Sequence, residues 1–95
     1  KLLSSNINEN EEVTFHIYPN PSTNEYINIV NDLSHVYENS SVKIFDMNGR
    51  LVIDKKIVQS GFTVKKINIS GLESGIYLVS LKNGDKIVNK KLIIQ

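Results

Sequence analysis

The 95-residue chain contains no cysteine, no alanine and no tryptophan. Without cysteine it can form neither a disulfide framework nor a thiolate zinc site. Alanine is the strongest helix former, whereas the 13 isoleucines and 9 valines of this chain favour strands. No run of residues approaches the roughly 18 apolar residues that a membrane-spanning helix needs. The composition therefore predicts one small all-β domain without a membrane span.

Short alternating segments, separated by turn residues, predict about seven antiparallel strands. Pro19 and Pro21 end the first strand because proline cannot donate to a ladder. Asn48-Gly49 and Asn83-Gly84 each predict a hairpin turn. The last strand alternates poorly, which indicates a bulge or an edge position at residues 89–91. The expected strands are 13–18, 25–30, 41–46, 50–58, 62–69, 76–82 and 86–94, with residues 31–40 as a loop, and this pattern is typical of a β-sandwich.

The apolar positions of these strands predict the core. Replacing one of them with alanine should cost about 2–5 kcal/mol, a large share of a small domain's stability. The expected core residues are Ile27, Ile29, Val42, Ile44, Leu51, Ile53, Ile67, Ile69, Tyr77, Val79 and Leu81.

Charge is unevenly distributed along the chain. Residues 1–41 carry one lysine against six acidic residues, whereas residues 42–95 carry ten basic residues against four acidic ones. One interpretation is a basic face that meets an acidic partner or an anionic glycolipid. The simpler one is that the lysines lie on solvent-facing or edge strands, where they discourage edge-to-edge pairing. Nucleic acid is not an expected partner, because no aromatic residues interleave the lysines.

No group of residues predicts catalysis, a metal site or a cofactor. His16 lies within a strand and His35 within a polar loop, and neither has a ligand cluster at suitable spacing. Asp46-Met47-Asn48-Gly49 resembles the start of a calcium loop but lacks the later ligands, so a hairpin turn is the better interpretation. Glu11 and Glu12 form the one close carboxylate pair, in a segment that cannot hold a fixed acid–base geometry. The chain is not expected to be an enzyme.

Residues 1–12 are polar and lack any strand or helix period, which predicts a flexible linker. The sequence begins with Lys1 rather than methionine and has no signal-peptide pattern. We therefore expect a piece of a longer protein, in which residues 1–12 join an upstream cargo to a domain at 13–95.

Four segments in this order carry a resemblance to a known family. The chain strongly resembles the type A C-terminal sorting domain of the type IX (Por) secretion system over residues 13–95. No single segment is specific, but their order and their position near the end of the sequence are. The segments are Tyr18-Pro19-Asn20-Pro21, residues 42–52, residues 67–79 and the lysine-bearing residues 90–94.

The resemblance implies an immunoglobulin-like sandwich that directs an upstream cargo across the outer membrane of Bacteroidota. It implies as partners the type IX translocon, an outer-membrane shuttle receptor and a surface sortase. The sortase would cut within or next to residues 1–12, and the cargo, first periplasmic, would be anchored at the surface or released. By position, the sorting-motif residues are Pro19, Asn20, Pro21, Gly49, Gly75, Tyr77, Lys90 and Lys91. Gln95 departs from the basic or small residue with which many members end.

Each of these residues also has a purely architectural interpretation, because prolines end strands, glycines supply positive φ and Tyr77 can anchor a core. Two alternative functions stay open. The first is an immunoglobulin-like binding or spacer module, such as a carbohydrate-binding one, which would need exposed aromatics; the candidates are Tyr18, Tyr26, Tyr37, Phe45 and Phe62. The second is an adhesin-type subunit that pairs through an exposed edge strand. Dimerisation through the last strand would support this second function.

Overall fold

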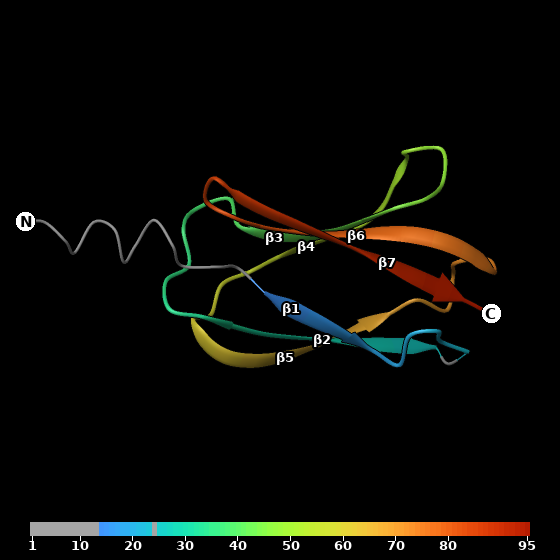
Figure 1. Cartoon of the computed structure of the whole chain (residues 1–95), viewed down its shortest axis with the longest axis horizontal. Helices are drawn as coiled ribbons and strands as arrows, with labels where there is room; N and C mark the ends of the chain where they lie inside the picture. The colour runs from blue at the N-terminus through green and yellow to red at the C-terminus, as the bar shows by residue number, and fades with distance from the viewer. Residues whose placement is uncertain (1–13, 24) are drawn as a thin grey trace, which may run out of the picture.

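The computed structural model describes residues 14–23 and 25–95, which form two antiparallel sheets stacked face to face (Figure 1). One sheet has three strands in the order β1-β2-β5, and the other has four in the order β4-β3-β6-β7. The predicted all-β sandwich of seven antiparallel strands is thus confirmed, with the arrangement of an immunoglobulin-like fold. The strands are β1 (Phe15–Tyr18), β2 (Tyr26–Leu33), β3 (Ser41–Phe45), β4 (Leu51–Lys56), β5 (Gly61–Asn68), β6 (Gly75–Asn83) and β7 (Lys86–Ile94).

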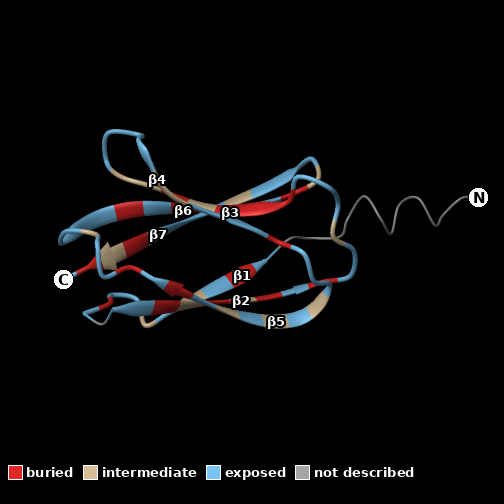
Figure 2. Cartoon of the chain, turned by 180° about the vertical axis from the view of Figure 1, so that it is seen from behind, coloured by how far each residue is buried: buried red, intermediate tan, exposed pale blue. Residues whose placement is uncertain are grey.

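The core fills the space between the sheets, and Figure 2 shows buried residues among exposed ones along the strands of both sheets. Nine of the eleven predicted core residues are buried; the exceptions are Leu51, which is 45% exposed, and Ile53, which is half-buried against the core. Alternation predicts such positions well because successive side chains of a strand point to opposite faces. The buried hydrophobic residues not predicted are Phe15, Leu33, Ile57, Leu92 and Ile94.

The prediction for Leu51 was wrong because the pairing of β3 with β4 shifts register. Ile44 lies opposite Ile53, but Phe45 lies opposite Leu51, so the ladder passes over Val52, which would otherwise lie opposite Phe45. An irregularity of this kind changes the face to which the following side chain points. Leu51 therefore shares the outer face of the sheet with Phe45.

Residues 31–40 were predicted to be a loop, but β2 continues through them to Leu33. Asn31 and Leu33 are buried, and they pair with Thr63 and Gly61 of β5. Asn31 can lie inside because its side-chain oxygen accepts a hydrogen bond from the Thr63 hydroxyl at 2.7 Å. A satisfied amide is tolerated in a strand that its polarity alone would not predict.

The last strand, β7, lies at the edge of the four-stranded sheet, as one of the two alternatives predicted. The other alternative, a bulge near residues 89–91, is wrong, since β6 and β7 pair without a register shift from Gly75↔Ile94 to Asn83↔Lys86. The predicted linker at residues 1–12 lies outside the described residues. Within residues 14–23 and 25–95, no helix has the length and hydrophobicity to cross a bilayer.

Candidate functional site

The structure brings the predicted sorting-motif residues to one end of the sandwich, the end at which β7 finishes (Figure 1). Residues 19–21 follow β1, Gly49 lies in the turn between β3 and β4, and Gly75 begins β6. Lys90 and Lys91 lie in the second half of β7. Gly49, Tyr77 and Lys91, which are far apart in the sequence, line one depression. We call this end of the molecule the motif end.

Asn20 joins the first motif to the last. Its side-chain nitrogen donates to the carbonyl oxygen of Lys91 at 2.8 Å, and its side-chain oxygen accepts from the N–H of Ile93 at 3.0 Å. The two contacts span 71 and 73 positions of sequence. The amide thus takes the place of a backbone peptide group along the open edge of β7, where unpaired groups would otherwise invite another strand.

Ser22 continues this cover toward the end of β7. Its N–H donates to the carbonyl of Ile93, and its own carbonyl accepts from the N–H of Gln95, both at 2.8 Å. Ser22 is fully buried and forms a parallel bridge with Ile94. The peptide bonds before Pro19 and Pro21 are both cis. Through the hydrogen bonds of Ser22, the segment after β1 leaves the three-stranded sheet and closes the edge of the four-stranded sheet.

Lys90 and Lys91 do not form one basic group, because neighbouring strand residues point to opposite faces. The Lys90 ammonium lies 5.8 Å from the centre of the buried Phe15 ring, within the range of a cation–π contact. Lys91 pairs with Leu78 on the outer face of the four-stranded sheet. The two lysines are both exposed, but only Lys91 belongs to the depression at the motif end.

Tyr77 has the architectural role of a core anchor, which is one of the two interpretations open from the sequence. The side chain is 9% exposed, and its hydroxyl donates to the carbonyl oxygen of Glu73 at 2.6 Å. A tyrosine near the start of this strand, bonded back to the chain just upstream, is the tyrosine corner of immunoglobulin-like domains. Gly75 begins the strand with a φ of +156°, and a Cβ added there would lie 4.0 Å from the Tyr77 ring. This pair fixes how the chain enters β6.

Asp46 organises the turn that contains Gly49. Its carboxylate accepts the backbone N–H groups of Asn48 and Arg50, each at 2.9 Å, and meets the Arg50 guanidinium at 3.1 Å. The backbone hydrogen bond from Arg50 is the main cause that lowers the pKa of Asp46 below its ordinary value of 3.8. Gly49 has a φ of +82°, which glycine adopts readily. These contacts bear out the hairpin interpretation of Asp46-Met47-Asn48-Gly49.

Asn83 has a role that the hairpin pattern did not reveal. The turn between β6 and β7 is Gly84-Asp85, and Asn83 is a buried strand residue. Its amide oxygen accepts from the Ser40 hydroxyl at 2.8 Å and the Tyr37 N–H at 3.2 Å, while its nitrogen donates to the His35 carbonyl at 2.8 Å. A Cβ at Gly84 would come within 3.0 Å of the Tyr37 ring. Asn83 therefore holds the loop between β2 and β3 at the end opposite the motif end.

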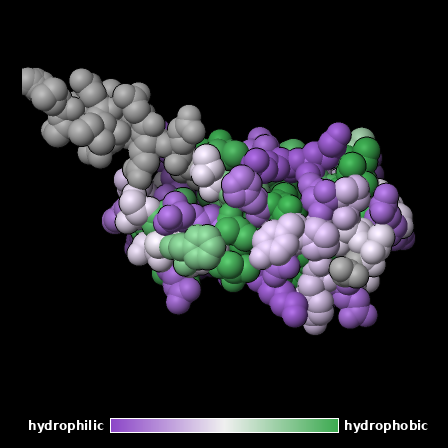
Figure 3. Space-filling view, turned by 60° about the horizontal axis from the view of Figure 1, so that its bottom comes forward, coloured by the Kyte–Doolittle hydropathy of each residue, from purple (hydrophilic) through white to green (hydrophobic). Residues whose placement is uncertain are grey.

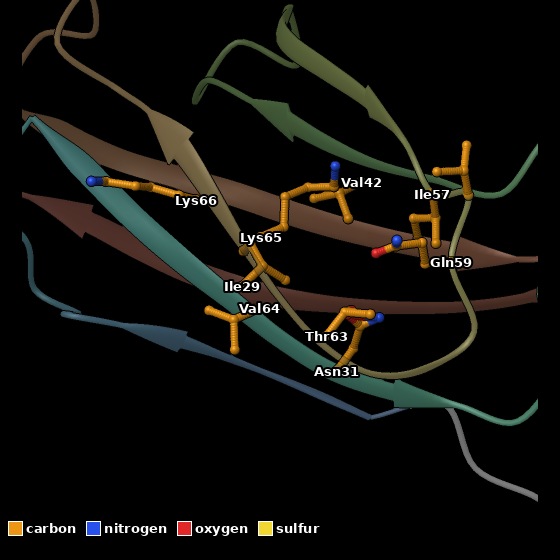
Figure 4. Close-up of a pocket in the computed structure, with 10 residues that line it drawn as sticks. Ile29, Asn31, Val42, Ile57, Gln59, Thr63, Val64, Lys65 and Lys66 are labelled. Carbon is orange, nitrogen blue, oxygen red and sulfur yellow. The ribbon is translucent and has the colours of Figure 1, made fainter.

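A second hollow of about 330 Å³ opens between the sheets beside β5 (Figure 4). Its lining includes Lys65, Lys66, Gln59 and the hydrogen-bonded pair Asn31 and Thr63, but none of the predicted motif residues. The hollow lies at the side of the sandwich, between the two sheets.

The two histidines join no site. His16 is exposed on β1, and the His35 ring stacks edge-on against Tyr37 at 4.4 Å. In the described part of the chain, no three His, Asp or Glu residues lie close enough to hold a metal ion.

Comparison with known proteins identifies one family. The model of the secretion system C-terminal sorting domain matches residues 16–95, which run from the second residue of β1 past the end of β7. No match is found among curated proteins.

Proposed function

The chain belongs to the family of secretion system C-terminal sorting domains, the signals for export by the type IX system, and we propose that its signal is read as a folded surface at the motif end. The family consists of sorting signals rather than enzymes, and membership implies association with type IX machinery and with an upstream cargo. The finer proposal concerns which residues carry the signal, which partners read it and what then happens to the cargo.

One observation carries the folded-surface proposal: the amide of Asn20 bonds to Lys91 and Ile93, more than 70 positions away. A signal read as a linear peptide at the end of the chain would have no use for that contact. Leu92 and Ile94 are themselves core residues, at 0% and 7% exposure. The end of the last strand is thus presented through its outer face, while its other face holds the core together and its free edge is covered by Asn20 and Ser22.

We further propose the partners and the fate of the cargo. An outer-membrane shuttle receptor reads residues 13–95, the translocon carries the cargo outward, and a surface sortase cuts in or next to residues 1–12. Support for the cleavage segment comes from its polar, aperiodic sequence, since proteolysis concentrates in exposed segments without packed structure. The cargo then passes from the periplasm to the outer surface, where it is anchored or released.

The test of the sorting function is a reporter fusion. Residues 1–95 are placed behind a signal peptide and a fluorescent protein, in a host with a type IX system and in a matched strain that lacks the translocon. We expect the reporter on the surface or in the medium in the first strain alone. A folded domain that leaves the reporter in the periplasm of both strains contradicts the proposal. Mass spectrometry of the exported reporter then shows whether a cut lies near residues 1–12; a reporter that still carries all 95 residues contradicts sortase removal.

A truncation of the last residues is a poor test of the same idea. Removing residues 92–95 takes two buried side chains from the core, so lost export would follow from unfolding alone. Substitutions on the outer surface separate recognition from stability.

The binding-module alternative has one observation in its favour, on the outer face of the three-stranded sheet. Tyr18 and Tyr26 are 48% and 38% exposed there, and the Lys66 ammonium lies 4.3 Å from the centre of the Tyr26 ring. Figure 3 looks onto this face and shows hydrophobic side chains in its middle among hydrophilic ones. Saccharide binding that is lost in Tyr18→Ser and Tyr26→Ser, without translocon-dependent export, would favour this function instead.

A further inference from the structure

A row of side chains crosses the outer face of the four-stranded sheet at the motif end. Leu51, Phe45, Leu78 and Lys91 lie opposite one another, one from each of β4, β3, β6 and β7. Leu51 and Leu78 are 45% and 42% exposed, although both are large apolar residues. Directly opposed residues share a face of the sheet and contact each other. Three apolar side chains and one lysine therefore form a continuous strip.

This strip borders a depression of about 560 Å³, a size within the range of roughly 300–1,000 Å³ found for binding sites. Its apolar lining comes from Phe45, Met47, Ile76 and Leu78, and Lys91 also lines it. Ile76 is 43% exposed and Met47 is 73% exposed. Transfer of an apolar group from water into a hollow lined in this way is favourable.

Two charged residues of the described ranges, Lys91 and Asp46, line the depression. In the described part of the chain no carboxylate lies within ion-pair distance of Lys91, and Asp46, which also lines the depression, is paired with Arg50 at 3.1 Å. Farther along the same face, the ladder places three lysines and one aspartate: Lys43, Lys56, Lys82 and Asp54. The face offers an unpaired cation beside an apolar hollow, with further positive charge behind it.

We propose that this depression is the docking site for a protein segment of the export machinery that inserts one apolar side chain and places a carboxylate on Lys91. The proposal rests on the sorting function above and specifies which surface of the folded signal is recognised. Charge complementarity identifies the partner's chemistry, an apolar anchor flanked by Asp or Glu. An anchor in a pocket with a charged rim is the usual way in which a small interface gains both affinity and orientation.

Two other occupants fit the observations less well. A second copy placed face to face would bring the lysines of both copies together, and like charges across an interface repel. A membrane surface is recognised through clusters of roughly 4–8 basic residues together with protruding apolar groups. Here the apolar residues line a hollow in which Lys91 is the one lysine among the described residues, and Lys43, Lys56 and Lys82 lie farther along the face together with Asp54.

The first test compares export of the reporter fusion among surface variants. Leu78→Thr removes apolar contact but keeps a strand-forming residue, and Lys91→Gln removes the charge. We expect Leu78→Thr to reduce the exported fraction about tenfold, as loss of a central apolar contact does, and Lys91→Glu to reduce it further than Lys91→Gln. Export of Leu78→Thr and Lys91→Glu at the parent level, with unchanged melting, would overturn the proposal.

Matched controls lie on other parts of the surface. Val64→Thr changes a residue that is 50% exposed on the outer face of the other sheet, and Lys82→Gln removes a lysine far along the same face. Both should leave export unchanged. If the controls reduce export as much as Leu78→Thr and Lys91→Gln, the effect does not belong to the depression and the proposal fails.

The second test identifies what occupies the depression. A photo-crosslinking amino acid replaces Met47 at its rim, or Val64 as the control, in cells that export the fusion. An adduct specific to position 47, mapped to a peptide with an acidic residue beside the crosslink, supports the proposal. A lipid adduct, an adduct with a second copy or no adduct in exporting cells overturns it.

These outcomes are separable from failure of the sorting function. If the parent fusion shows no translocon-dependent export, the proposed function itself fails. If the parent is exported and the depression variants are exported equally, only the docking site is wrong.

Discussion

Replacing Asn20 with alanine should loosen the end of β7 while the rest of the sandwich stays folded. Asn20 is exposed, so its substitution leaves no cavity in the core. What it removes is the pair of hydrogen bonds to the Lys91 carbonyl and the Ile93 N–H, at 2.8 and 3.0 Å. The bonds from Ser22 to Ile93 and Gln95 remain, so the strand end is weakened rather than released.

The magnitude follows from the number of bonds and their exposure. Each hydrogen bond contributes about 0.5–1.5 kcal/mol net, and water can replace part of the loss at this exposed edge. We expect a loss of about 1–2 kcal/mol, which raises the population of the locally open form about 5–30-fold. If the end of β7 opens only with the whole domain, Tm should fall by about 4–8 °C for each kcal/mol.

Amide hydrogen exchange of Ile93 measures this directly, since its N–H loses its acceptor in the variant. We expect exchange at Ile93 and Gln95 to accelerate, and exchange in β2 and β3 to change much less. Asn89→Ala is the matched control, because Asn89 lies on the same strand and its side chain makes no hydrogen bond among the described residues. Exchange at Ile93 as slow in Asn20→Ala as in the parent would refute the idea that Asn20 holds this strand.

Three further predictions test the other contacts. Tyr77→Phe removes the hydroxyl bond to Glu73 and should lower the free energy of unfolding by about 1 kcal/mol in urea titration, and an unchanged midpoint would argue against a tyrosine corner. Asn83→Ala leaves the buried Ser40 hydroxyl and two part-buried backbone groups, the Tyr37 N–H and the His35 carbonyl, without their partner and should cost about 2–4 kcal/mol; a loss below 1 kcal/mol would mean that the loop between β2 and β3 does not depend on it. The lowered pKa of Asp46 means that its ionised form stabilises the fold above pH 3.8, and that this contribution is lost as pH falls below that value. The Tm difference between the parent and Asp46→Asn should therefore be present at neutral pH and shrink toward pH 2, whereas a constant difference would exclude the carboxylate as its source.

The sequence proposed the candidate site as a set of residues but did not reveal the contacts between them. Turn and strand chemistry correctly predicted the turn at Gly49 and the end of β1 at Pro19, because each of these residues acts on its own stretch of backbone. Lys90 and Lys91 are neighbours in the sequence, yet the strand directs them to Phe15 and to the outer face respectively. The hydrogen bonds of Asn20 gave no signal in the sequence, since its partners lie more than 70 positions away.

The sequence by itself determined the all-β class, the seven strands and most of the core, because alternation and turn residues act over two to eight neighbouring positions. Only the tertiary structure decided where those rules were overruled. A shift in register turned Leu51 outward, hydrogen-bond partners on other strands allowed Asn31 and Asn83 to be buried, and the segment at Asn20 crossed to the edge of β7. Each of these depends on which distant group supplies a partner, and pairings of that kind are settled when the two sheets come together.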